Sequence, residues 1–210
     1  TPSVKTQAIK LMTDMPPNPQ INLALREFVN SPELDVRVAA WEGLSKRNDP
    51  TISRELIGPD KGEPKFILET VAADEPMIYV TQQGEPKIVI FGHEGGPKGS
   101  AGGLKLNKPS LVSAWSDRFM VAADTATSDL RLRYVNSRTN QTIQTKPPQD
   151  VTGFIEYLAH KPTPEDPGPG LDFTYSEVVG AVYEMTRQGG ISAVFATEQD
   201  KLRAEIFEAS

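Results

Sequence analysis

Four short motifs with one pattern constrain the fold of the amino-terminal third more than any other feature. Each has a helix-capping residue, then proline, one further residue and an aliphatic residue: TPSV at 1–4, NPQI at 18–21, SPEL at 31–34 and DPTI at 49–52. Thr, Asn, Ser and Asp accept hydrogen bonds from helix amides, and proline suits the first helical position because its missing N–H has no partner there. We therefore predict that Pro2, Pro19, Pro32 and Pro50 each open a helix.

The spacing of these motifs indicates a two-helix repeat. The first and third lie 30 residues apart and the second and fourth 31. The expected apolar stripes are Val4, Ala8, Leu11 and Met12, then Ile21, Leu25, Phe28 and Val29, then Val36, Ala40, Gly43 and Leu44. We expect residues 1–58 to form an antiparallel helical stack that ends near Gly58. Because repeats need neighbours to bury their faces, the helix at 3–13 either belongs to an array that was cut or packs on the rest of the chain. The start at Thr1, without a signal-like stretch, is expected for a fragment or a processed form.

One of these segments resembles a known repeat. The series Asp35-Val36-Arg37, Ala40 and Leu44 is similar to the second helix of a HEAT-type repeat. That resemblance implies that Asp35 and Arg37 tie neighbouring repeats together. The alternative is a solvated charge pair on the helix surface.

The second domain, expected at residues 64–210, has a different pattern. KFILETV, MIYVT, PKIVIFG, SLVSAWS, RFMVAA, LRLRYV and QTIQT predict antiparallel strands within 64–146, and QQGE at 82–85 predicts a hairpin turn. From 150 to 210 we expect two helices, DVTGFIEYLAH and TYSEVVGAVYEMTRQGG, followed by closing strands at SAVFAT and LRAEIFE. The predicted fold class is therefore α+β.

The glycine-rich stretch FGHEGGPKGSAGG at 91–103 follows a strand, as a phosphate-binding loop does. Aligned on Gly92 and Lys98, however, it has Pro97 where that loop needs glycine and Gly99 where it needs Ser or Thr. No helix pattern follows it, so no helix amino terminus would face an anion. We expect residues 92–103 to form a mobile, exposed loop that binds no nucleotide.

No residue is nominated as catalytic, cofactor-binding or metal-binding. His93 with Glu94 would at most ligate a surface ion, and His160 is expected at a helix carboxyl terminus. The acidic pairs Glu165-Asp166 and Asp74-Glu75 are expected to be solvated. Trp41 and Trp115 are expected to be core residues. The sequence NQT at 140–142 has the form of a glycosylation site, and we interpret it as a chance match. We therefore expect that the protein is not an enzyme and that it binds no cofactor.

Composition excludes further classes of function. The formal net charge of −6 disfavours nucleic acid, and no apolar run is long enough to span a membrane. The chain has no cysteine, which removes thiolate chemistry and disulfides.

The carboxy-terminal sixty residues resemble the end of the flagellar basal-body P-ring protein family. Val151, Ile155 and Leu158 approximate the pattern of its first helix. Glu177, Val178 and Val179 match the start of its second helix, and Leu202, Ala204 and Ile206 match its closing strand. MIYVTQQGEPKIVIFG is similar to a segment of planctomycete-type members, in which HEAT-like helices precede it. The loop at 161–170 and the stretch SAVFATEQD depart from the family pattern, and its large ring-forming amino-terminal part is absent.

The resemblance implies a non-enzymatic structural or assembly module in the periplasm or secreted cell envelope. Its expected partners are proteins, copies of itself or cell-wall polysaccharide. The alternative is a binding scaffold of helical repeats and strands, unrelated to flagella, that recognises a peptide or a polysaccharide.

Overall fold

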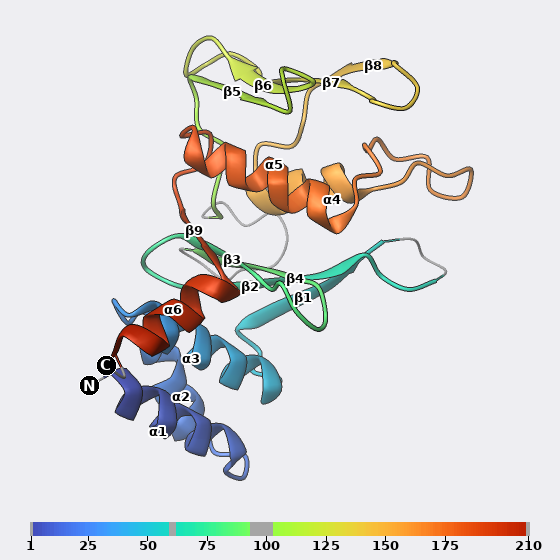
Figure 1. Cartoon of the computed structure of the whole chain (residues 1–210). Coiled ribbons are helices and arrows are strands. Elements are labelled where there is room, and N and C mark those ends of the chain that lie inside the picture. Colours follow the sequence, from blue (N-terminus) through green and yellow to red (C-terminus); the bar gives the residue numbers. More distant parts are fainter. Residues whose placement is uncertain (1, 59–61, 93–102, 209–210) are drawn as a thin grey trace.

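The structure is a computed structural model that describes residues 2–58, 62–92 and 103–208. Helices and strands alternate in four layers (Figure 1): three amino-terminal helices with the last helix, a five-stranded sheet, two central helices, and a four-stranded sheet. The fold class is α+β, as predicted. The glycine-rich loop predicted at 92–103 falls, apart from its two ends, outside the described residues.

The first layer begins with α1 (Pro2–Asp14), α2 (Pro19–Phe28) and α3 (Leu34–Lys46). The predicted starts at Pro2 and Pro19 are confirmed, and the Asn18 side chain caps α2 by accepting a 2.9 Å hydrogen bond from the amide of Gln20. The start at Pro32 is wrong by two residues. The Ser31 hydroxyl donates to the Glu33 carboxylate instead of capping the helix, and α3 begins only after Glu33.

The helix predicted at Pro50 is wrong, and the helical stack does not reach Gly58. Residues 52–57 form a strand, β1 (Ile52–Ile57), in which Ile52 pairs with Val71 of the next strand. The Asp49 carboxylate does accept a hydrogen bond from the amide of Thr51, at 3.0 Å, but it is also held by Arg26. The local signal is therefore that of a turn, and tertiary pairing makes the residues after this turn a strand.

The apolar stripes predicted for α2 and α3 are confirmed, because Leu25, Val36 and Leu44 share one core with Ile21 and Phe28 at its margin. Gly43 allows close approach, since a Cβ there would lie 2.5 Å from the Thr13 hydroxyl oxygen.

The stripe predicted for α1 is only partly right as a core face. Met12 packs at the margin of the core, but Val4 is 63% and Leu11 71% exposed, and the buried residue is Ile9, which the stripe did not include. The helix has apolar residues on two opposite sides, and the helical period alone does not say which side packs.

The five-stranded sheet has the order β1-β2-β4-β3-β9. Its remaining strands are β2 (Phe66–Ala72), β3 (Met77–Val80), β4 (Lys87–Gly92) and β9 (Val194–Thr197). The predicted hairpin is confirmed, with Gly84 at φ +70° in the turn between β3 and β4. Two pairs, β2 with β4 and β3 with β9, are parallel rather than antiparallel. The first pair is parallel because β3 lies on the far side of β4 and not between β2 and β4. The second pair joins segments far apart in sequence, and strand patterns reveal neither arrangement.

The four-stranded sheet is a simple antiparallel meander. It contains β5 (Ser110–Ala114), β6 (Phe119–Ala123), β7 (Arg131–Val135) and β8 (Thr142–Thr145) in that order. The predicted alternation on β7 is confirmed: Leu132 and Tyr134 are buried, and Arg131 and Arg133 are exposed. Its buried face packs on the central helices.

The central helices are α4 (Val151–Ala159) and α5 (Tyr175–Arg187), and the chain continues from β9 into α6 (Glu198–Glu208). Asp150 caps α4 as predicted, and Gly189, at φ +78°, follows the end of α5. The closing strand predicted at LRAEIFE is wrong, because this segment lies within α6. Asp200 accepts hydrogen bonds from the amide (2.9 Å) and hydroxyl (2.8 Å) of Thr197, the last residue of β9, which stabilises the turn from strand to helix.

Two hydrophobic cores result, one on each face of the five-stranded sheet. Ile78 and Ile90 face the central helices, whereas Tyr79 and Val89 face α1 to α3. Such alternation is dictated by the two-residue period of a strand.

Candidate binding pocket beside Trp41

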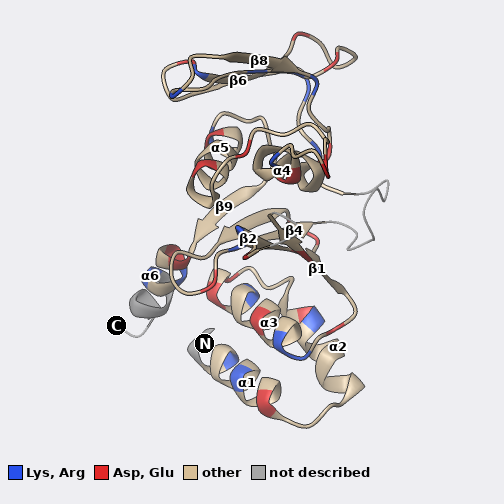
Figure 2. Cartoon of the chain, turned by 90° about the vertical axis from the view of Figure 1, so that its right-hand side faces the viewer, with Lys and Arg blue, Asp and Glu red and all other residues tan. Residues whose placement is uncertain are grey.

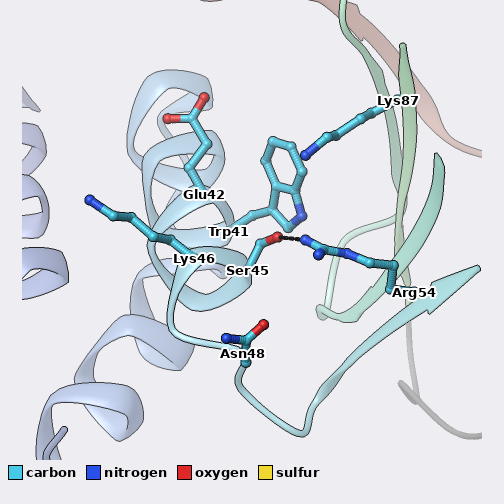
Figure 3. Close-up of a pocket in the computed structure, with 7 residues that line it drawn as sticks. All are labelled: Trp41, Glu42, Ser45, Lys46, Asn48, Arg54 and Lys87. Atoms are coloured by element: carbon cyan, nitrogen blue, oxygen red, sulfur yellow. Dashed lines mark hydrogen bonds between the residues drawn. The ribbon is translucent and has the colours of Figure 1, made fainter. Parts of the chain in front are cut away.

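A pocket of about 280 Å³ opens where α3 meets the five-stranded sheet. Figure 3 shows the side chains that line it, which come from α3, the turn after it, β1 and β4: Trp41, Glu42, Ser45, Lys46, Asn48, Arg54 and Lys87. Arg54 and Lys87 point toward Ser45 and Trp41, whereas Lys46 points away along the outside of α3 (Figure 3). The inner part of the pocket is thus lined by one aromatic ring and two cationic side chains.

A buried carboxylate organises the wall of this pocket. Glu69 lies on β2 and is fully buried. Its Oε2 accepts from the indole Nε1 of Trp41 at 2.7 Å, and its Oε1 accepts from Arg54 Nε at 2.8 Å. The Ser45 hydroxyl also donates to Oε1 at 3.1 Å and itself accepts from the Arg54 guanidinium at 2.7 Å.

The local sequence explains why these groups meet. Trp41 and Ser45 are four residues apart on α3 and so share one face of the helix. On β2, Glu69 alternates with Leu68, which faces the opposite core, so that the carboxylate points to α3. A buried charge is stable only when it is paired and hydrogen-bonded, and Glu69 meets both conditions.

The charges around the pocket are largely compensated. Arg54 pairs with Glu69 at 2.7 Å, Lys87 with Glu85 at 3.1 Å and Lys46 with Asp14 at 2.7 Å. Glu42 pairs with Lys201 of α6 at 2.8 Å. The pocket is therefore suited to hydrogen-bond a small polar group against an aromatic wall, rather than to attract an ion over a distance.

A second polar cluster lies where α2 meets the start of β1. Asp49 is buried and accepts from the Arg26 guanidinium at 2.9 Å and from the side-chain amide of Asn22 at 2.7 Å. Burial by itself raises the pKa of the Asp49 carboxyl, but the hydrogen bonds from Arg26, Thr51 and Asn22 outweigh it and lower that pKa below its ordinary value. Asp49 is thus held as a carboxylate.

Asp35 and Arg37, which the repeat resemblance singled out, are both buried and make inter-element contacts. Asp35 accepts a 3.3 Å hydrogen bond from the Thr6 hydroxyl on α1. Arg37 donates to the carbonyls of Val29 at 3.1 Å and Glu75 at 2.7 Å, and its guanidinium lies 5.2 Å from the centre of the Phe91 ring. Desolvation by burial lowers the pKa of Arg37. A solvated surface pair, the alternative, is wrong.

The other residues named from the sequence lie apart from the pocket. Trp41 is buried as predicted, whereas Trp115 is partly buried against Phe119 and Phe173. His160 lies at the carboxyl end of α4, as predicted, with Nδ1 3.6 Å from the Asp166 carboxylate. His93 and Glu94 lie outside the described residues.

Neither a metal centre nor a membrane span emerges from the part of the chain that the structure describes. There, no three His, Asp or Glu side chains group so as to hold a metal ion. Nor is any helix in that part long and apolar enough to cross a membrane.

Sequence reasoning missed the Glu69 cluster. The available signal was a glutamate inside the apolar strand KFILETV, because such a position demands a buried partner.

The fold and the pocket define a four-layered α+β protein with a polar pocket beside its helical layer. No family model, curated protein or solved structure matches the chain.

Proposed function

We propose that the protein is a non-enzymatic structural or assembly module of a P-ring-like complex in the cell envelope. The observation that carries the assembly part is the outward apolar stripe of α1 and the residue just after it. Val4, Leu11 and Met15 are 63%, 71% and 53% exposed, and they lie on one side of the helix, away from the buried Ile9.

This stripe supports docking of a helix from a partner protein. A helix at the surface of a globular protein normally turns its apolar side inward, and α1 already buries one such side against α3. Stacked helical repeats bury their remaining faces by adding another helical layer. A partner helix lying on Val4, Leu11 and Met15 would extend the first layer in this way.

The envelope and P-ring part of the proposal rests on the resemblance of the last sixty residues. The helices at 151–159 and 175–187 support the two helical segments of that resemblance. The segment at 202–206, which resembles a closing strand in the family, is helical here, and it does not support the proposal.

The test uses the tagged full-length protein in its native host. We expect it in the envelope fraction, within a complex much larger than the monomer, and we expect Leu11→Glu to release it from that complex. Leu23→Glu is the matched control, because Leu23 is an exposed leucine on α2 outside the stripe. Recovery of the wild type as a cytoplasmic monomer, or equal assembly of the Leu11→Glu variant, would contradict the proposal.

The Trp41 pocket favours a second candidate, a binding scaffold unrelated to flagella. Its inward-pointing Arg54 and Lys87 beside an aromatic ring suit a polar group of a peptide or a sugar. Saturable binding of a peptidoglycan fragment or a peptide that Arg54→Gln abolishes, together with no large complex in cells, would favour this candidate over the first.

A further inference from the structure

The outer face of the four-stranded sheet combines basic and aliphatic side chains. Along β6 and β7 the side chains alternate in exposure, so one set of side chains faces the core and the other set faces outward. The outward set, which we call the arginine face, consists of Arg118, Met120, Ala122, Arg131 and Arg133. It lies at the end of the molecule opposite α1 (Figure 1).

The strand register brings these side chains together. Met120 pairs with Arg133, and Ala122 pairs with Arg131 on one side and with the exposed Leu111 of β5 on the other. Arg118 precedes β6 and joins the register because its carbonyl accepts from the amide of Val135 at 2.8 Å. Same-face neighbours on adjacent strands are close enough to contact one ligand.

Two of the three arginines have no acidic partner in the part of the chain that the structure describes. Arg131 pairs with Asp124 at 2.6 Å. The guanidinium of Arg118 instead donates to the carbonyl of Trp115 at 3.1 Å, and that of Arg133 donates to the carbonyl of Asp117 at 3.2 Å. These bonds position both guanidinium groups without neutralising them.

The charge of this face contrasts with that of the chain. Residues 110–146 contain five Lys and Arg against three Asp and Glu, whereas residues 147–197, with α4 and α5 beneath, contain two against seven. In Figure 2 the upper sheet carries blue, with some red at its loops, and α5 carries red. When an acidic protein concentrates unpaired arginines on one face, the positive potential of that face attracts a negatively charged partner.

We propose that the arginine face binds an acidic amphipathic helix of a partner protein. Arginine favours carboxylates because its planar fork donates two parallel hydrogen bonds. The partner should also make apolar contacts, because Met120, Ala122 and Leu111 lie between and beside the arginines. This favours a polypeptide over a polysaccharide or a nucleic acid. This surface is separate from the α1 stripe, so either proposal can fail without the other.

The experiment measures fluorescence anisotropy of a labelled 20-residue helical peptide with leucine on one side and glutamate on the other. We expect saturable binding to the wild type that weakens as salt is raised. Arg118→Gln with Arg133→Gln should weaken binding about tenfold or more. The control is Lys10→Gln with Arg203→Gln, which removes the same charge from exposed positions on α1 and α6 and should leave binding unchanged.

A charge exchange keeps the test valid if the glutamine variant is destabilised. A variant with Arg118→Glu and Arg133→Glu should bind the peptide in which lysine replaces glutamate, and the wild type should not. Equal weakening in the control, failure of the exchange, or binding of polygalacturonate or duplex DNA in preference to the acidic peptide would overturn the proposal.

Discussion

The two cores of this protein differ in what they bury. Among the described residues, the buried polar and charged side chains all belong to the core between α1 to α3 and the five-stranded sheet. They are Thr6, Asp35, Arg37, Ser45, Asp49 and Glu69. The core around α4 and α5 is instead filled by aliphatic and aromatic residues. At its centre, Phe173 packs against Trp115, Phe119 and Tyr134, with ring centroids 4.9 to 6.1 Å apart.

This difference explains how each layer is positioned. Hydrogen bonds and ion pairs are directional, so the polar groups of the first core specify where each helix meets the sheet. Apolar contacts specify volume and not direction. The central helices are therefore oriented by a few polar links at their ends, such as Lys65, which donates to the carbonyls of Ala159 and Phe173.

The largest effect is expected in the apolar core. Phe173→Ala should lower the free energy of unfolding by about 3–5 kcal/mol, because the cavity is enclosed by three other rings. Chemical denaturation measures it. Phe173→Leu should cost clearly less, and an equal loss in both variants would show that ring shape rather than volume matters here.

Leu25→Ala tests whether an apolar side chain in the core between α1 to α3 and the five-stranded sheet contributes as much to stability as Phe173 does in the other core. Leu25 is fully buried between the helices, so a loss of about 2–5 kcal/mol is expected. Leu23→Ala, at an exposed position of the same helix, is the control. A change below about 0.5 kcal/mol at Leu25 would place the stability of this layer in its polar contacts alone.

Glu69→Ala tests the other side of the contrast, because it removes a polar group from the first core. It leaves the indole N–H of Trp41 and the Nε–H of Arg54 without their acceptor, although Arg54 keeps its hydrogen bond to the Ser45 hydroxyl. We expect a loss of about 2 kcal/mol, less than for a fully buried ion pair because Arg54 reaches solvent. Trp41 fluorescence should change with it, and an unaltered spectrum and stability would contradict the role assigned to Glu69.

The smallest expected effect is the pH dependence that Asp49 confers. Its pKa is lowered in the folded protein, so its contribution to stability is present above the unfolded pKa of about 3.9 and is lost as the pH falls through the folded pKa. Asp49→Asn should therefore flatten the stability curve at acidic pH. If wild type and variant lose stability in parallel between about pH 5 and pH 2, another carboxylate is responsible.

Much of the local structure could be predicted from the sequence alone. Capping residues predicted the starts of α2 and α4. The alternation of apolar and basic residues predicted β7 and its solvent-exposed face, and a glycine predicted the hairpin after β3. These signals are local because they arise from the hydrogen bonds and backbone angles of neighbouring residues.

The candidate pocket could not be predicted in the same way. Its lining comes from α3, the turn after it, β1 and β4. Only the pairing of β1 with β2 and of β2 with β4 brings Arg54 and Lys87, together with the buried Glu69 behind the lining, near Trp41. The motif at Asp49 carries the same cap-proline pattern as true helix starts, yet the next residues gain more by pairing with β2 than by forming a helix turn.

The amino-acid sequence alone thus specifies most of the segments, many of their faces and the charge contrast between the outer sheet and the central helices. Tertiary contacts were needed to establish that β9 pairs parallel to β3, that the last segment is a helix, and that α1 buries Ile9 rather than Leu11. This division arises because periodicity identifies an apolar side of an element, whereas burial depends on which partner surface is near. That surface is supplied by residues distant in the chain.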